Sequence, residues 1–434
     1  MGLAVRVTGR VTGRGVTRRA PSTDRVAAEI ETWLCAQAPD VVRSVVVSPA
    51  SADEEIAIAV DLHPAALPVL ITLSGDRRVE VAGDTAPVGP GYHTYVCRLF
   101  ERLGEDVGVD WEETDEDGAG VDGQSSGDTR DPAASTRAAT ERVQLGWLRA
   151  VLGQTLDARR NGATGLHLAT PPGVRYAIDE GVATALGPRD DDWLERAVDD
   201  PRVAVELWPW WADATDGRYL LNRALCLLWN AVRWRSPATD EERAVVDEVL
   251  LLLRKAYQTE PSLPYPWPEW RELIELRGAP DKMAEQIAQR AARDDTTPAI
   301  GYRRQPVTVI HGGWSLVVPG SFAERRSADE WWGGESGRRI TIAATDTADD
   351  GRPMAADVFL ARVAADLGSD VMTHREDGLV GRARLDVDAS SGVEVGVLDG
   401  FSAVTGRGAA IRVEFDDPAD WQWAVDMWRG LRPT

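Results

Sequence analysis

The sequence has few cysteines, almost no lysine and no long apolar run. Its three cysteines (Cys35, Cys97 and Cys226) are widely spaced and form no CxxC pair, which excludes a disulfide framework and favours a reducing compartment. Lys255 and Lys282 are the only lysines, so arginine supplies nearly all of the 48 basic residues. No stretch approaches the roughly 18 consecutive apolar residues of a membrane helix, and the N-terminus lacks the apolar core of a signal peptide. The sequence therefore predicts a cytoplasmic protein without a membrane span.

Short catalytic and cofactor-binding motifs are also absent. We find no GxxxxGKS/T loop, no GxGxxG that opens a helix after a strand, no GxSxG and no HExxH. Five histidines and three cysteines are scattered over the chain, so no tetrahedral zinc site is indicated. Asp192, in the acidic run 190–192, is interpreted more simply as a helix N-cap than as a cation ligand. We therefore expect no cofactor and no metal, and leave open whether the chain is an enzyme.

Acidic residues and tryptophan are abundant. Seventy Asp and Glu against 48 Lys and Arg give a formal net charge of −22 over 434 residues, and 17 Trp outnumber 5 Phe and 7 Tyr. The length suits about three domains. The charge argues against nucleic-acid binding, because phosphate contacts need clustered Lys and Arg, and it suits a basic protein partner.

The residue pattern divides the chain into five segments. Residues 1–22 carry several arginines and no acid, which predicts a disordered basic arm. Residues 23–113 follow the order α-β-β-β-β-α, typical of a small α+β domain with an antiparallel sheet. Residues 114–137 are rich in Asp, Gly and Ser and predict an acidic flexible linker.

The remaining two segments complete an α+β multidomain fold class. Residues 138–293 predict a mainly helical, Trp-rich domain, with one helix expected over 219–235. Residues 300–434 return to strand-like runs, with a helix at 353–367 and a closing helix at 418–431.

The last segment opens with GWSLVVPGSF, a strand that ends in a proline and then an aromatic residue. Trp331-Trp332, a strand, one long helix, antiparallel strands and a terminal helix with Trp421, Trp423 and Trp428 follow. In this order of elements the segment resembles the fold shared by the photosystem subunit PsbP, the DcrB lipoproteins and a nuclear-import factor that binds the Ran GTPase. The resemblance implies an antiparallel sheet with helices and a role in binding or assembly, and it transfers no site residue.

The first candidate site is the run GPGYHTYVC, which contains Tyr92 and His93. Helical geometry places His93 and Cys97 on one face at i,i+4. The run has three interpretations: a packed helix turn, a ligand or partner surface formed by Tyr92 and His93, or a thiolate activated by the imidazole.

The other candidates lie in the Trp-rich segment. Trp208, Trp210 and Trp211 cannot all face one core, so we expect at least one on a partner surface, with inter-domain packing as the alternative. Trp229 and Arg233 suit a cation–π pair at i,i+4. Arg233 and Arg235 predict either an anion or carboxylate clamp or salt bridges with the acids at 240–242. Trp267, in the run YPWPEW, is typical of a docking loop or of a helix cap.

These features together predict a non-enzymatic protein-interaction module that binds another protein. An immunity protein or another component of a bacterial conflict or antiviral defence system would fit this description. The first alternative is an enzyme without a short linear motif, its site in the helical segment. The second is an acidic mimic of nucleic acid. The partner and the oligomeric state stay open.

Overall fold

The computed structural model describes residues 4–12, 22–36, 42–49, 55–63, 65–112, 132–178, 180–207, 216–293, 299–327, 329–349, 352–368, 371–388 and 394–434. The chain forms two compact units. The first unit comprises residues 1–172, 178–226 and 256–263, and the second comprises 173–177, 227–255 and 264–434. The segment 138–293, expected as one helical domain, therefore contributes to both units, because the division falls inside helices α5 (Gly217–Asn230) and α6 (Asp240–Thr259).

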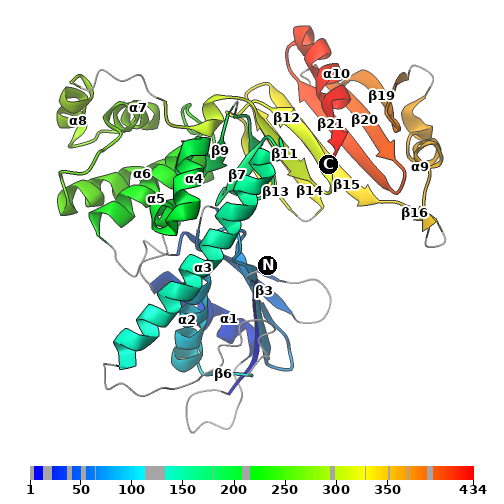
Figure 1. The fold of residues 1–434 in the computed structure, drawn as a ribbon. Helices are drawn as coiled ribbons and strands as arrows, with labels where there is room; N and C mark the ends of the chain where they lie inside the picture. Colours follow the sequence, from blue (N-terminus) through cyan, green and yellow to red (C-terminus); the bar gives the residue numbers. More distant parts are fainter. Residues whose placement is uncertain are drawn as a thin grey trace. The chain divides into compact units, whose positions relative to one another are not determined.

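The first unit contains a six-stranded antiparallel sheet with the strand order β2-β3-β4-β5-β1-β6 (Figure 1). Helices α1 (Thr23–Ala36) and α2 (Pro90–Val107) pack on each other and contact the sheet. The strands are β1 (Ala4–Val11), β2 (Ser44–Pro49), β3 (Ile56–Asp61), β4 (Val69–Leu73), β5 (Arg78–Asp84) and β6 (Val109–Trp111). The expected antiparallel α+β arrangement is present, with one more strand at each end of the segment.

The disordered arm predicted over 1–22 is wrong for residues 4–11, which form β1. This strand pairs with β5 from Ala4 to Arg10 and with β6 from Gly9 to Val11. Val5 and Val11 are buried. The positive charge of this run favoured a disordered arm. Its valines nevertheless recur with a period of two, which is the pattern of a half-buried strand. Residues 13–21 lie outside the described part of the chain.

A long helix, α3 (Pro132–Arg160), follows the acidic segment. Residues 132–137, expected as the end of the linker, are helical, and the helix begins at a proline, whose missing N–H costs nothing at that position. The earlier linker residues, 114–131, lie outside the described residues.

In the rest of the first unit, α4 (Asp191–Asp199) and a 3₁₀ helix (η1, Pro201–Leu207) pack against α3. The unit also contains a three-stranded sheet of β10 (Gly187–Arg189), β9 (Val182–Thr184) and β7 (Leu166–Leu168). The expected N-cap of α4 is Asp190 rather than Asp192: the Asp190 carboxylate accepts from the backbone N–H of Trp193 at 2.7 Å. Asp191 accepts two hydrogen bonds from Arg159, each 2.9 Å long.

The second unit contains two larger sheets. A four-stranded sheet has the order β22-β12-β11-β8, from β8 (Val174–Tyr176), β11 (Val307–His311), β12 (Trp314–Val318) and β22 (Arg432–Pro433). A seven-stranded antiparallel sheet, drawn from yellow to red in Figure 1, has the order β13-β14-β15-β21-β20-β19-β18. Its strands are β13 (Ala323–Arg326), β14 (Glu330–Glu335), β15 (Arg338–Asp346), β18 (Met372–Glu376), β19 (Leu379–Asp388), β20 (Val395–Val404) and β21 (Arg407–Phe415).

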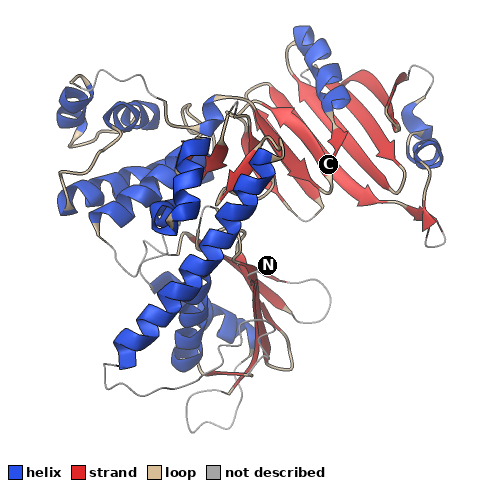
Figure 2. Cartoon of the chain, in the orientation of Figure 1, coloured by secondary structure: helices blue, strands red, loops and turns tan. Residues whose placement is uncertain are grey.

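Helices complete this unit (Figure 2). They are α7 (Trp267–Arg277), α8 (Ala284–Ala291), the 3₁₀ turns η2 (Tyr302–Arg304), η3 (Ala365–Leu367) and η4 (Pro418–Asp420), α9 (Ala356–Val363) and α10 (Trp421–Gly430), with a small β16 (Ala348–Asp349)–β17 (Arg352–Pro353) ladder. These elements bear out the mixed α/β character of the chain. The likeness to PsbP stays a prediction.

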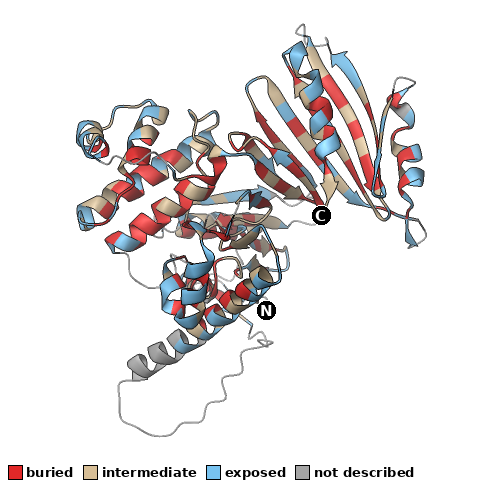
Figure 3. Ribbon diagram, turned by 45° about the horizontal axis from the view of Figure 1, so that its top comes forward, coloured by how far each residue is buried: buried red, intermediate tan, exposed pale blue. Residues whose placement is uncertain are grey.

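The two helices on the seven-stranded sheet cover opposite faces. Trp428 of α10 is buried against Gly400 and Gly381, where a side chain would collide with its ring. Phe359 and Leu360 of α9 pack with Val380 and Ala403, which point the other way. Because helices cover both faces, buried and half-buried residues follow one another along β20 and β21 (Figure 3).

Candidate anion-binding site

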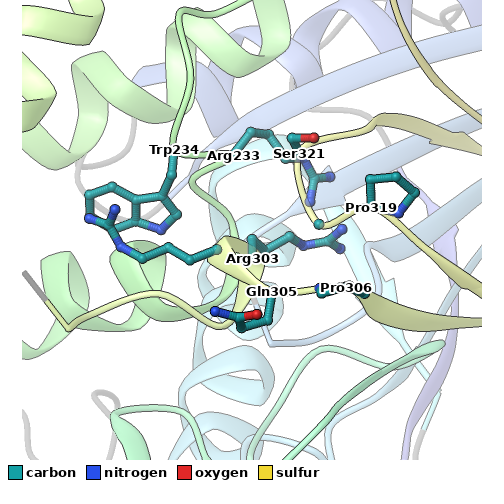
Figure 4. A pocket seen from close by; sticks show the side chains of 9 residues that line it. Arg233, Trp234, Arg303, Gln305, Pro306, Pro319 and Ser321 are labelled. Atoms are coloured by element: carbon teal, nitrogen blue, oxygen red, sulfur yellow. The ribbon is translucent and has the colours of Figure 1, made fainter. Parts of the chain in front are cut away.

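The second unit contains a cavity of about 300 Å³ with several arginines in its wall (Figure 4). We call it the arginine pocket. It is lined by Arg233, Trp234, Arg303, Arg304, Gln305, Pro306, Pro319, Gly320 and Ser321. These residues come from three segments: the loop after α5, the turn η2 with the residues that follow it, and the loop after β12.

Arg233 reaches the pocket because α5 ends before it. The helix predicted over 219–235 ends at Asn230, and Trp234 adopts a left-handed backbone conformation with φ 55°. This conformation is uncommon for a residue with a side chain and is incompatible with a helix that continues to residue 235. Trp229 and Arg233 are therefore not neighbours on one helix, and the Trp229 ring instead lies 4.8 Å from that of Tyr302.

A buried ionic cluster forms one wall of the pocket. Glu324 of β13, whose side chain is 10% exposed, accepts a hydrogen bond from Arg303, which is 4% exposed. Arg233 Nη1 lies 3.7 Å from Glu324 Oε1, and the Trp331 indole donates to Oε2 at 3.3 Å. Two arginines thus share one carboxylate.

The charges of this cluster set the ionisation of its carboxylate. Burial by itself raises the pKa of Glu324, but the positive charges of Arg303 and Arg233 outweigh burial and hold this pKa at about 2. Glu324 is therefore ionised at neutral pH.

Arg233 is the less well compensated of the two arginines. Burial lowers its pKa to about 10, and the charge of Arg303 acts in the same direction, while Glu324 and, to a smaller extent, Glu242 oppose both. Its Nη1 atom is buried and has no hydrogen-bond partner among the described residues. In Figure 4 the guanidinium groups of Arg233 and Arg303 lie next to each other. The cluster therefore retains one positive charge that Glu324 does not neutralise.

Trp234 and Arg304 form a second wall. The Arg304 guanidinium lies 3.6 Å from the centre of the Trp234 ring, a cation–π contact. Arg304 also donates to both carboxylate oxygens of Glu272, at 3.0 and 2.6 Å, so its charge is paired. Gly301 (φ 124°) allows the close approach, since a Cβ atom there would lie 2.0 Å from Trp234 Nε1. This wall is held in place before any ligand arrives.

Arg235 has a structural role rather than the clamp role that was one of its two interpretations. It donates to both oxygens of Glu242 at 2.8 Å, which is the salt bridge with the acids at 240–242 that the sequence also allowed. Its Nε atom donates to the Ser321 carbonyl at 2.8 Å. Arg235 therefore fixes the loop that carries Ser321 into the pocket wall.

Trp267 packs at the start of α7 as a helix-capping residue would. Its ring stacks on that of Trp270 at 5.5 Å and 7°, and Trp270 is fully buried. The neighbouring Glu269 accepts from the backbone N–H groups of Ala299 and Ile300 at 2.9 and 3.1 Å, which anchors the chain just before η2. The run thus supports the pocket, and a docking role of Trp267 stays a prediction.

Tyr92 and His93, in the first unit, occupy different environments. Tyr92 is 1% exposed, with its ring 5.7 Å from that of His63, so it is a core residue and not part of a partner surface. Burial raises the pKa of Tyr92 and lowers that of His63. His93 Nδ1 lies 2.9 Å from Thr85 Oγ1, and its Nε2 lies 3.7 Å from Cys97 Sγ, as the i,i+4 spacing predicted.

The charged residues of the pocket and its ionic cluster that sequence reasoning missed are Arg303, Arg304 and Glu324. The adjacent arginines of GYRRQP, between Gly301 and Pro306, were a weak signal, and Glu324 in a polar run had none. Trp208, Trp210 and Trp211 lie in 208–215, outside the described residues.

The described residues define a mixed α/β protein with an arginine-lined cavity. Within them, no group of three or more His, Cys, Asp or Glu side chains could hold a metal ion, and no helix is long and apolar enough to cross a membrane.

Comparison with known proteins adds no family. No family model and no curated protein matches the chain. One matching solved structure is a protein of Bacteroides thetaiotaomicron, with 6% identity and a TM-score of 0.25, and the match covers 28% of this chain and 45% of that one. A likeness at this level carries no argument about fold or function.

Proposed function

We propose that the protein is a non-enzymatic interaction module that recognises an anionic group of its partner molecule in the arginine pocket. The observation that carries the proposal is the wall in which Arg233 and Arg303 share the single carboxylate of Glu324. The net charge of the chain favours a basic partner overall, whereas this site favours an anionic group. The bacterial conflict setting stays a prediction from the sequence.

The excess charge of the wall is the physical basis of the proposal. A buried cation that is incompletely neutralised is destabilising, because desolvation costs more than the remaining attraction returns. An anion in the pocket would restore the balance. Guanidinium groups are also the side chains that bind carboxylate and phosphate groups best, since they can donate two parallel hydrogen bonds.

Replacing Arg233 by methionine (Arg233→Met) tests the proposal. Charge-assisted hydrogen bonds contribute about 1.5–3 kcal/mol, so we expect the variant to bind anions at least about tenfold more weakly than the wild type. Isothermal titration calorimetry with propionate, inorganic phosphate and sulfate measures the change. The matched control is Arg412→Met, on β21, because it removes the same charge from a residue that does not line the pocket. No saturable binding of any of the three anions to the wild type, or equal binding by Arg233→Met, would contradict the proposal.

A second readout separates a binding role from a structural one. If the role of Arg233 is ligand binding, Arg233→Met leaves Glu324 paired with Arg303 alone. The ligand-free variant should then be at least as stable as the wild type. If Arg233 only supports the fold, the free energy of unfolding should fall. Urea unfolding of both proteins without added anions, in a buffer of a bulky zwitterion, decides between these outcomes.

A further inference from the structure

The charges that line the arginine pocket indicate which kind of anion it binds, provided that the proposed anion binding holds. Among the residues that the structure describes, three charged side chains line the cavity: Arg233, Arg303 and Arg304. Glu272 neutralises Arg304 through two hydrogen bonds, and Glu324 neutralises one of the other two arginines. One positive charge is left, so a ligand with a single negative charge completes the balance.

One further arginine, Arg326 of β13, interacts with this cluster. Burial lowers its pKa, and its charge acts on both Glu324 and Arg303. Its guanidinium donates to the Gly173 carbonyl at 3.0 Å and does not line the cavity. Arg326 therefore offers no hydrogen bond to a ligand in the pocket, and the count is taken over the side chains that line it.

The ionised Glu324 disfavours a ligand with two negative charges. Phosphate and its monoesters carry about −1.5 to −2 at neutral pH. Such a group would bring more negative charge than the wall can neutralise next to a carboxylate that stays ionised. Carboxylates carry one charge and two acceptor oxygens in a plane, which matches a guanidinium.

The remaining lining points to an organic body on the ligand. Pro306, Pro319 and the Trp234 ring supply apolar surface beside the arginines. A cavity of about 300 Å³ is at the lower end of small-molecule sites and exceeds the needs of an inorganic ion. Contacts with proline and tryptophan would remove apolar surface of the ligand from water.

We infer that the arginine pocket binds a monocarboxylate with a small apolar body, its carboxylate facing Arg233 and its apolar part against Trp234, Pro306 and Pro319. Two sources supply this chemistry: a free organic acid and the terminal carboxylate of a peptide chain.

Calorimetric titration of the full-length wild type tests the inference. The probes are propionate, benzoate, propionamide, inorganic phosphate, and acetyl-trialanine with either a free or an amidated C-terminus. Propionate and benzoate should bind, propionamide and the amidated peptide should not, and phosphate should bind at least about tenfold more weakly than benzoate. Arg233→Met should abolish the carboxylate signal, whereas Arg412→Met should retain it.

The outcomes separate this inference from the proposed function. Binding of the free-acid peptide at least as tight as that of benzoate supports a carboxylate ligand from a peptide chain, and binding of benzoate alone supports a small organic acid. Phosphate binding tighter than carboxylate binding and lost in Arg233→Met overturns the monocarboxylate and leaves anion recognition standing. If none of the anions binds, both fail.

Discussion

Replacing Glu324 by glutamine lowers the free energy of unfolding by about 3–5 kcal/mol at pH 7, because the change leaves Arg303 and Arg233 without their shared counter-ion. Glutamine keeps the size of the side chain and removes the charge, so the loss reports the ionic cluster and not a cavity. Urea unfolding monitored by circular dichroism measures it. Glu330→Gln is the matched control: Glu330 is exposed on the neighbouring strand β14, and its replacement should change stability by less than about 0.5 kcal/mol.

The stability that Glu324 contributes should depend on pH. The folded-state pKa of Glu324, about 2, is depressed below the ordinary value of 4.5, so the folded protein holds the carboxylate ionised more strongly than the unfolded chain does. The resulting stability, about 3 kcal/mol, is fully present above pH 4.5 and is lost as the pH falls through 2. The difference between the wild type and Glu324→Gln should therefore shrink as the pH falls from 4.5 towards 2. A difference that is constant over this range would show that Glu324 does not act through its charge.

Replacing Gly301 by alanine produces the second large effect, a loss of about 2–4 kcal/mol together with the loss of anion binding. Two physical causes contribute to the loss of stability. The φ of 124° is strained for a residue with a side chain, and the new Cβ would lie 2.0 Å from Trp234 Nε1. The Trp234 ring must then move, which breaks its stacking with Arg304 and deforms the pocket wall. Thermal unfolding and calorimetric titration with benzoate measure the two effects.

Gly278→Ala separates steric displacement from backbone strain. Gly278 also has a positive φ, 65°, at the end of α7, but a Cβ atom there meets nothing within 4 Å. The control should cost only about 1 kcal/mol and leave binding intact. If Gly278→Ala and Gly301→Ala are equally destabilised and equally able to bind, the packing of Trp234 against Gly301 does not shape the pocket.

The positions of most helices and strands could be predicted, because buried faces leave a periodic pattern in the sequence. The order α-β-β-β-β-α of residues 23–113 and the closing helix of the chain follow from spacing alone. Helix ends are less predictable. No residue type around Trp234 indicates a left-handed backbone, so periodicity alone predicts a helix that continues past Asn230. Strand β1 was missed because its arginines hid the alternation of its valines.

The pocket was only partly predictable, because its residues meet through the tertiary fold. Arg233 stood out as a basic residue beside tryptophans in an acidic chain, and an anion clamp was one of its interpretations. Its true neighbours, Arg303 and Glu324, come from distant parts of the sequence that only the fold brings together. Arg235 lies in the same run of arginines and tryptophans as Arg233. Its charge is neutralised by the nearby carboxylate of Glu242.

The most direct measurement of anion recognition is a crystal structure of the protein soaked with the tightest-binding anion of the titration panel. Anion recognition in the arginine pocket predicts density for the ligand with an oxygen about 2.7–3.2 Å from a guanidinium nitrogen of Arg233. An empty pocket, or a ligand bound only elsewhere on the protein, would contradict it.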